Sequence, residues 1–456
     1  MEERIFKAYD IRGIYGKEFN KEDVKKIAQA YLYTISQKLN KPIKELHLAV
    51  GRDIRASSEE LLDTAIEVFL SYGVTVDTFG LFSINDFYFS IGYYKYDAGF
   101  MATASHNPPE YGGVKMAFLS LEQDDVLNFV SGKELYQELI QMEFPLSAEQ
   151  LPGQLNEKEA FVDHLEHVLS FVDISKIRPL KVVVDTGNGM NGLMIPKIFD
   201  KIPCELIHLF PDLNSDFSNR PPNPLAEGAA DQLAARVQAE NADLGVIYDV
   251  DGDRMFLVDE KGGFVRGDMV LLLLAQTMLK KYPQGGIVYN LICSHAVPDL
   301  VTKWGGRPIR SEVGYVNLSR HMNQEDGIMS GELSAHFAFR DNFYADNGFI
   351  ALLLVLQTIS EGDRKLSEII KEFQLYAKGD EINLPVEDIP AALDKIRNMF
   401  QDNIKDEIDG ITAEFEDWWF NVRPSNTEPL LRVTVEAANQ PMLQEKTKEI
   451  IDLINN

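Results

Sequence analysis

The 456-residue sequence is poor in cysteine, in positive charge and in long apolar runs. Its two cysteines, Cys204 and Cys293, are too few for a disulfide framework and favour a reducing cytoplasm. Lys and Arg number 44 against 71 Asp and Glu, and the net charge of −27 argues against nucleic acid or an anionic membrane as a partner. The longest apolar run, near Met269–Ala275, is too short to span a bilayer, and Met1–Lys7 lacks the apolar core of a signal peptide. We therefore expect a cytoplasmic protein that binds neither nucleic acid nor membrane.

The sequence does contain enough apolar residues, 45%, for several packed cores. Its length predicts three or four domains of roughly 100–150 residues each. A pattern of strand, loop, helix and strand begins three times, at Leu46, Leu180 and Gly286. Each copy predicts a mixed, partly parallel sheet with helices on both faces. In the first copy, Ser57–Glu60 has the pattern of a capping box that begins the helix.

The final part of the chain follows another pattern, which predicts an α+β domain of about 80 residues. It contains a strand at Glu381–Leu384, a helix with Ile389, Leu393, Ile396 and Phe400 on its inner face, strands at Trp418–Phe420 and Leu430–Val435, and a closing helix from Met442. The predicted domains are residues 1–150, 151–258, 259–372 and 373–456.

The segment Thr103–Lys115 places a hydroxyl nucleophile in an irregular loop. It follows the small apolar stretch Ala98–Ala102, which predicts a buried strand, and Pro108 and Pro109 prevent a helix from continuing. Ser105, with His106 beside it and Lys115 further on, fits a residue that carries a covalent group and is held by cations. A plain polar turn is the alternative for this motif taken alone.

A second motif places Asp249, Asp251 and Asp253 at alternate positions directly after the apolar Leu244–Tyr248. A tight turn at Gly252 lets three carboxylates converge on one hard divalent cation. A calcium loop is excluded because Arg254 stands where that loop needs glycine. A solvated acidic turn stays as the alternative. Three carboxylates leave room for a fourth ligand, which Ser105 or a phosphate on it could supply.

Three further segments offer polar groups to a ligand. In Gly331–His336, a carboxylate and a hydroxyl suit sugar hydroxyls, although a surface turn explains this motif equally well. Arg423–Pro429, with Arg432 after it, combines guanidinium, hydroxyl and amide donors and suits a phosphate clamp; a solvated turn is the alternative. Near the start, Tyr9–Gly13 places Arg12 beside a glycine turn, which is compatible with an anion site.

These five motifs occur in the order seen in the α-D-phosphohexomutases, and the chain resembles that family over nearly its whole length, most closely the phosphomannomutase/phosphoglucomutase branch. The motifs are Tyr9–Gly13, Thr103–Pro108, Asp249–Arg254, Gly331–His336 and Arg423–Pro429. The resemblance implies an α/β protein with three similar mixed-sheet α/β/α domains. A C-terminal α+β domain that is similar to the TATA-binding-protein fold completes a central cleft.

The resemblance also implies a phosphoserine at Ser105 and one Mg²⁺ per chain, held by the serine phosphate and by Asp249, Asp251 and Asp253. The implied reaction interconverts hexose 1-phosphate and hexose 6-phosphate through a 1,6-bisphosphate, which serves as intermediate and activator. Substrate binding is assigned to Tyr9, Arg254, Glu332, Ser334, Arg423, Ser425, Asn426, Thr427 and Arg432. Neutralisation of the transferring group is assigned to Arg12, Lys115 and Arg254. Proton transfer is assigned to Lys115, with His336 or His106 as the alternatives. We expect small hexose phosphates as the partners of a monomer or weak homodimer.

Several alternatives stay open at this point. The sequence does not distinguish mannose from glucose, and a phosphoglucosamine mutase shares the mechanism. A haloacid-dehalogenase-type phosphatase would use Asp249 as its nucleophile, but it would leave the Ser105 loop unexplained. A non-catalytic sugar-phosphate sensor would not be expected to keep the complete set of motifs. The chain departs from the usual family pattern at Ser83–Asn85, Gly112, His295 and Tyr315.

Overall fold

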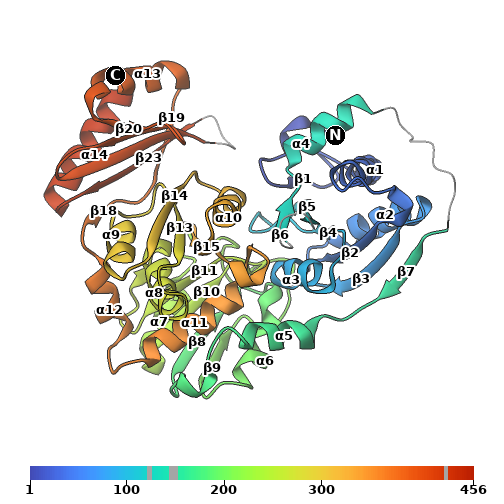
Figure 1. Cartoon of the computed structure of the whole chain (residues 1–456), viewed down its shortest axis with the longest axis horizontal. Helices are drawn as coiled ribbons and strands as arrows, with labels where there is room; N and C mark the ends of the chain where they lie inside the picture. Colours follow the sequence, from blue (N-terminus) through green and yellow to red (C-terminus); the bar gives the residue numbers. More distant parts are fainter. Residues whose placement is uncertain (121–125, 143–151, 426–429, 456) are drawn as a thin grey trace. The chain divides into compact units, whose positions relative to one another are not determined.

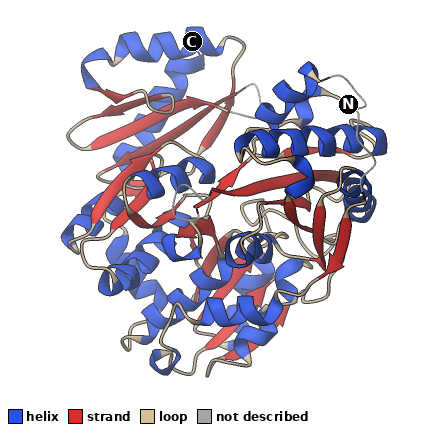
Figure 2. Cartoon of the chain, turned by 45° about the vertical axis from the view of Figure 1, so that its right-hand side comes forward, coloured by secondary structure: helices blue, strands red, loops and turns tan. Residues whose placement is uncertain are grey.

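The computed structural model describes residues 1–120, 126–142, 152–425 and 430–455 (Figure 1). The chain divides into two compact units, of which the first comprises Met1–Arg266 and Ser334–Ser367 and the second Gly267–Leu333 and Glu368–Asn456. Figure 2 shows helices flanking strands throughout the chain. The mixed α/β architecture predicted from the sequence is confirmed.

A seven-stranded sheet forms the N-terminal part of the first unit, in the order β1-β5-β4-β2-β3-β7, with β6 paired to β5. Strands β2, β3, β4 and β7 are parallel, whereas β1, β5 and β6 join in antiparallel pairs. The strands are β1 (Ile11–Ile14), β2 (His47–Arg52), β3 (Thr75–Leu81), β4 (Ala98–Ala102), β5 (Tyr111–Ser120), β6 (Val126–Phe129) and β7 (Gln154–Glu157). The accompanying helices are α1 (Lys21–Lys38), α2 (Ser58–Ser71), α3 (Ile84–Tyr94) and α4 (Gly132–Gln141). Strand β4 is buried along its whole length, as its small apolar residues predict.

The predicted capping box at Ser57–Glu60 is wrong. Ser57 precedes α2 with helical dihedrals, φ −82° and ψ −19°, and makes no capping hydrogen bond. A capping hydroxyl needs an extended backbone at that position. The next residue, Ser58, instead donates its hydroxyl proton to Asp53 Oδ1 at 2.5 Å. The turn that precedes α2 therefore uses its polar groups to order the loop after β2.

The rest of the first unit contains a five-stranded sheet in the order β12-β11-β10-β8-β9. Strands β8, β9 and β10 are parallel, and β11 returns antiparallel to β10. The strands are β8 (Lys181–Asp185), β9 (Glu205–Leu209), β10 (Leu244–Tyr248), β11 (Met255–Asp259) and β12 (Phe264–Val265), and the helices are α5 (Phe161–Leu169), α6 (Ile195–Phe199) and α7 (Asp231–Glu240). The antiparallel pair β16 (Phe337–Phe339) and β17 (Ala345–Asp346) and helix α11 (Gly348–Ser360) also belong to this unit.

The second unit has three parallel strands, β13 (Gly286–Asn290), β14 (Arg307–Ser311) and β15 (Gly327–Gly331). Its helices in this part are α8 (Gly267–Lys281), α9 (Ala296–Lys303) and α10 (Tyr315–Gln324), and α12 (Leu366–Phe373) leads towards the final domain. The apolar run Met269–Ala275 lies in α8 and is buried. Within the described ranges, no helix combines the length and the hydropathy needed to cross a bilayer.

The final domain is an antiparallel sheet in the order β18-β23-β22-β21-β20, with β19 also paired to β23. Its elements are β18 (Ala377–Lys378), β19 (Ile382–Pro385), α13 (Ile389–Met399), β20 (Ile404–Asp406), β21 (Ile411–Glu414), β22 (Trp418–Pro424), β23 (Leu430–Ala437) and α14 (Gln440–Asn455). The predicted strands and helices all appear, and Ile396 and Phe400 are buried in its core. The sequence missed β18, β20 and β21, because strands of two to four residues show no clear alternation.

Candidate active site

Ser105 lies just beyond the carboxyl end of β4, as predicted, and is almost fully buried. Its φ of +52° is in the left-handed region that non-glycine residues seldom adopt. The backbone N–H of Ser105 donates to Thr103 Oγ1 at 3.0 Å, and the N–H of Asn107 donates to Ala104 O at 3.1 Å. A strained backbone of this kind often marks a functional position.

Arg55, which the sequence analysis did not single out, holds the serine loop from within. Its guanidinium donates to four backbone carbonyls of the loop, those of Ser105 at 2.5 Å, Asn107 at 2.7 Å, Pro108 at 2.7 Å and Tyr111 at 3.3 Å. Asp53 lies 3.2 Å from Arg55 Nε and balances its charge. The sequence could have indicated this contact, because β2 and β4 are parallel neighbours and the loops that follow them must meet at one edge of the sheet.

Arg12, on β1, contacts the same loop. Its Nη1 donates to Asn107 Oδ1 at 2.9 Å, and its Nε donates to Asp10 Oδ2 at 2.8 Å. Tyr9 lies half-buried in the bend before β1. The predicted cation at the start of the chain therefore lies beside the predicted nucleophile.

The aspartate loop joins β10 to β11, so its flanks are strands as predicted. Asp249 Oδ1 accepts hydrogen bonds from the backbone N–H groups of Gly252 and Arg254, both at 3.1 Å. Gly252 has a φ of +89°, and a Cβ there would come within 2.0 Å of Asn191 Oδ1. The turn brings carboxylate oxygens of Asp249, Asp251 and Asp253 within 4.8 Å of one another.

Lys115 and Ser105 connect the serine loop to the aspartate loop. Lys115 lies on β5 opposite Met101 of β4, and its Nζ donates to Asp251 Oδ2 at 2.7 Å and to Asp253 Oδ2 at 2.8 Å. Ser105 Oγ lies 3.1 Å from Asp251 Oδ1 and 3.2 Å from His106 Nδ1. Two motifs that are 146 residues apart in the chain thus share one site.

The carboxylates of this site fit a divalent cation. Asp249 Oδ2 and Asp253 Oδ1 are buried and accept no hydrogen bond from the described residues. Burial, reinforced by the charges of Asp251 and Asp253, raises the pKa of Asp249 well above its ordinary value. These oxygens are hard ligands that no described residue satisfies with a hydrogen bond, and their burial disfavours their negative charge. Mg²⁺ would bind such oxygens and stabilise the ionised carboxylates.

Neighbouring cations act differently on two other groups. Burial alone would raise the pKa of Asp253, but Lys115, His336 and Arg254 outweigh it and hold that pKa far below its usual range. Burial, together with the positive charges of Arg254 and Arg12, lowers the pKa of His106 well below its ordinary value. His106 is therefore a neutral imidazole at physiological pH.

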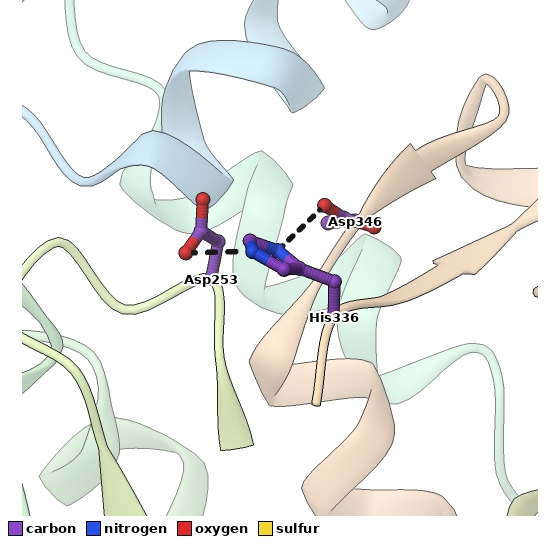
Figure 3. A group of neighbouring side chains, drawn as sticks. All are labelled: Asp253, His336 and Asp346. Atoms are coloured by element: carbon purple, nitrogen blue, oxygen red, sulfur yellow. Dashed lines mark hydrogen bonds and ion pairs between the residues drawn. The ribbon is translucent and has the colours of Figure 1, made fainter. Parts of the chain in front are cut away.

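His336 lies between the carboxylates of Asp253 and Asp346 (Figure 3), and the guanidinium of Arg254 also contacts its ring. Its Nδ1 lies 3.0 Å from Asp346 Oδ2 and 3.9 Å from Asp253 Oδ1, while Arg254 Nε donates to Nε2 at 3.0 Å. Burial alone would lower the pKa of His336, but Asp253 and Asp346 raise it. The two carboxylates therefore favour a proton on the ring, whereas the positive charge of Arg254 opposes it. Asp346 was not predicted from the sequence.

The two residues predicted to bind the sugar belong to different units, because the chain passes from the second unit to the first between Leu333 and Ser334. Glu332, in the second unit, is buried, and its Oε1 accepts from Gly314 N at 2.7 Å and from Asn290 Nδ2 at 3.2 Å. Ser334 begins the segment that returns to the first unit and is half-buried. The roles of both residues stay predictions.

The predicted phosphate clamp is a pair of arginines on adjacent strands. Arg423 of β22 stands directly opposite Arg432 of β23. Glu381 bridges them, accepting from Arg423 Nη2 at 2.7 Å and from Arg432 Nη1 at 3.4 Å. The Nε atoms of both arginines are buried and donate to no described residue. Of the remaining predicted members, Ser425 directly follows β22, and Asn426 and Thr427 lie outside the described residues.

Two departures from the family pattern have structural explanations. Gly112 stands where a Cβ would meet Ser57 Oγ at 2.7 Å, so the neighbouring serine occupies the space of a larger side chain. His295 stacks its ring on Trp419 at 4.8 Å and lies 3.6 Å from Glu414, so it packs against the final domain of the second unit. Tyr315 begins α10 and is half-buried.

Comparison with known proteins places these motifs in one family. Models of four consecutive domains match residues 3–119, 159–263, 266–376 and 381–453, and are described as phosphoglucomutase/phosphomannomutase alpha/beta/alpha domains I, II and III and the C-terminal domain. The chain belongs to the phosphoglucomutase/phosphomannomutase family. The predicted resemblance is therefore confirmed.

Individual members of the family are similar to this chain over its full length. A phosphomannomutase of Methanocaldococcus jannaschii is 35% identical over 455 residues, which cover 99% of this chain and 97% of the relative. Proteins named phosphohexose mutases from Xanthomonas campestris are 33% identical over 98% of both chains. The crystal structure of a family member from Burkholderia thailandensis superimposes with a TM-score of 0.87 at 26% identity, covering 100% of this chain and 98% of that one.

Proposed function

We propose that this protein interconverts hexose 1-phosphates and hexose 6-phosphates, with mannose or glucose as the sugar, through a phosphoserine at Ser105. One observation carries the proposal: the buried Ser105 hydroxyl lies 3.1 Å from Asp251, within a site that also holds Lys115 and two carboxylate oxygens that accept no hydrogen bond from the described residues. A serine that only caps a turn would not need buried cations and metal-ligand groups around it. The full-length similarity to phosphomannomutases supports the same reaction.

The phosphoryl group moves twice in the proposed cycle. The Oγ–P bond of phosphoserine breaks as the free hydroxyl of the sugar phosphate forms a new O–P bond, which gives a 1,6-bisphosphate. After the bisphosphate turns over, its other phosphoryl group returns to Oγ. When bound, Mg²⁺ withdraws electron density from the transferring phosphate. Arg12 and Lys115 hold positive charge beside the serine loop and the aspartate loop, and such electrostatic stabilisation dominates phosphoryl transfer.

In the first transfer, a proton moves from the attacking sugar hydroxyl to the departing serine oxygen. In the second transfer, the Ser105 hydroxyl attacks the bisphosphate and its proton goes to the departing sugar oxygen. We assign the proton at the serine oxygen to His106, whose Nδ1 lies 3.2 Å from Oγ and whose lowered pKa keeps the ring neutral. Lys115 and His336 are the candidates for the sugar hydroxyl. The arginine pair Arg423 and Arg432, bridged by Glu381, supplies the donors for the phosphate that is not reacting.

The proposal is tested by locating the phosphate and by assaying the reaction. Intact-mass and phosphopeptide analysis should find one phosphate, on Ser105. The Ser105→Ala variant should keep its fold by circular dichroism and lose activity by about 10⁴-fold or more, since it removes the covalent carrier. Parallel coupled assays with the 1-phosphates of mannose, glucose and glucosamine would identify the sugar. Phosphate on another residue, or full activity in the alanine variant, would refute the phosphoserine mechanism.

A further inference from the structure

Two buried asparagines hold the backbone of the aspartate loop. Asn85 Nδ2 and Asn191 Nδ2 both donate to the carbonyl of Gly252, at 2.8 and 3.1 Å. The two side chains also contact each other, because Asn85 Nδ2 lies 3.3 Å from Asn191 Oδ1. Both residues are fully buried. Gly252 lies between Asp251 and Asp253, so its peptide unit sets the direction in which both carboxylates point.

Asn85 also reaches a third segment of the chain. Its Oδ1 accepts from the backbone N–H of Gly348 at 3.1 Å, and Gly348 begins α11. The first N–H groups of a helix have no partner within the helix, so this bond satisfies one of them. A single side chain thus connects α3 to residues that are 167 and 263 positions away in the sequence.

Helix α3 is firmly attached to the strand that carries the nucleophile. Phe87 and Ile91 of α3 and Met101 of β4 share one buried core cluster. A Cβ at Gly99 of β4 would come within 2.5 Å of Ile91, so helix and strand pack in close contact. The start of α3 is fixed by a capping box between Ser83 and Asp86. Asn85 is therefore a rigid link between the serine loop at the end of β4 and the aspartate loop after β10.

We propose that Asn85 and Asn191, the amide pair, are positioning residues that fix the aspartate loop for Mg²⁺ and align it with Ser105. This inference rests on the proposed function. Neither asparagine is a metal ligand, and neither needs to touch the sugar phosphate. The amide pair acts through the Gly252 carbonyl, in the way that residues behind metal ligands tune a metal site.

The test compares Asn85→Ala, Asn191→Ala and the double variant with the wild-type protein, using Mn²⁺ as a probe that electron paramagnetic resonance detects without turnover. Each single variant should weaken Mn²⁺ binding by about 10- to 100-fold, the usual cost of losing a residue behind the ligands. The double variant should fall short of the product of the two single effects, because both amides bind one carbonyl. Turnover should show a reduced kcat with little change in KM.

Gln357→Ala is the matched control. Gln357 is a nearly buried amide on α11 that accepts from the backbone N–H of Asp173 at 2.9 Å and makes no hydrogen bond to the aspartate loop among the described residues. The Gln357→Ala variant should have a lower thermal stability than the wild type, with unchanged Mn²⁺ affinity and kcat. If Asn85→Ala does not fold, Asn191→Ala carries the test, since it removes the other donor to the same carbonyl. Wild-type protein that binds no Mn²⁺ overturns the proposed metal site along with the amide pair. Tight wild-type binding with unchanged affinity and kcat in folded variants overturns the amide pair alone.

Discussion

The carboxylate of Asp249 destabilises the metal-free protein, although the proposed metal site needs it. It is buried beside two other carboxylates, and its ionised form is unfavourable until a cation arrives. A carboxylate whose pKa is raised on folding binds its proton more tightly in the folded state than in the unfolded chain. Stability therefore falls as the pH rises from the unfolded pKa towards the folded one, and the metal-free protein carries this cost at neutral pH.

Asp249→Asn should therefore stabilise the metal-free protein while abolishing Mg²⁺-dependent activity. The amide keeps the acceptor for Gly252 and Arg254 N–H and removes the charge. We expect the melting temperature in EDTA at neutral pH to rise by about 2–4 °C, with the difference vanishing below about pH 3, where the carboxyl is protonated in both states. Added Mg²⁺ should raise the melting temperature of the wild type and leave the variant unchanged. A variant that melts below the wild type in EDTA would contradict this reading of the site.

At the scale of elements, the loop after β4 depends on the loop after β2. Arg55 supplies four hydrogen bonds to backbone carbonyls between Ser105 and Tyr111, and its planar guanidinium spans them in a way that a single ammonium group does not. The left-handed Ser105 backbone is held in place by this arrangement. The nucleophile is thus positioned by a residue on a different loop.

Arg55→Lys should consequently impair catalysis although it keeps the charge. A serine displaced by about 1 Å loses roughly 100-fold in rate, so we expect kcat to fall by that order, with a smaller change in KM. The neighbouring Arg52→Lys is the control, because the Arg52 side chain donates to Glu59 and to the carbonyl of Asp53 and makes no hydrogen bond to the serine loop among the described residues. Equal kcat values for the two variants would show that the loop holds its shape without Arg55.

The strand pair β22 and β23 carries the arginine pair, Arg423 and Arg432. Two like charges directly opposite each other on adjacent strands are unfavourable without an anion, and Glu381 supplies one. Arg423→Ala should raise KM for mannose 1-phosphate and glucose 1-phosphate by a similar factor, of about 10-fold or more, because the guanidinium binds phosphate and not sugar. Phosphorylation of Ser105 should persist. A strong change in the ratio of the two KM values would instead place Arg423 against the sugar ring.

At the scale of the molecule, the final domain shares a compact unit with the third. The backbone N–H of His295 donates to Glu436 at 2.9 Å, the N–H of Val313 donates to Asp409 at 3.2 Å, and Arg310 pairs with Asp406. These contacts join residues 295–313 of the third domain to the fourth, so we expect this part of the chain to lose stability when the fourth domain is removed.

Removing residues 373–456 should abolish mutase activity, because the arginine pair is lost with them. We expect the remaining chain to fold, with a first unit that still binds Mn²⁺, since the serine and aspartate loops and the amide pair all lie in that unit. Differential scanning calorimetry should show a lower melting temperature for the residues from Gly267 onward. Near-normal kcat/KM in the truncated protein would exclude the arginine pair from substrate binding.

Sequence by itself determined the family, the element types and the chemistry of the candidate residues. Strands such as Ala98–Ala102 and Leu244–Tyr248 are short apolar runs bounded by polar residues, so their identity follows from local composition. Ser105 and the three aspartates stand out because hydroxyl and alternating carboxylates at strand ends are chemically unusual. Such features need no knowledge of what lies nearby in space.

Only the tertiary structure decided which partners these residues have. Arg55, Asp346 and Glu381 have no distinctive neighbours in the sequence, and each acts on a group that a different element supplies. The predicted capping box at Ser57 is wrong for the same reason. Asp53, on the preceding loop, accepts a hydrogen bond from Ser58, and Ser57 has helical dihedrals. Local sequence patterns predict the backbone conformation and the chemical groups that each segment offers. Hydrogen-bond partners across strands and loops depend on packing, which brings together residues that the sequence keeps far apart.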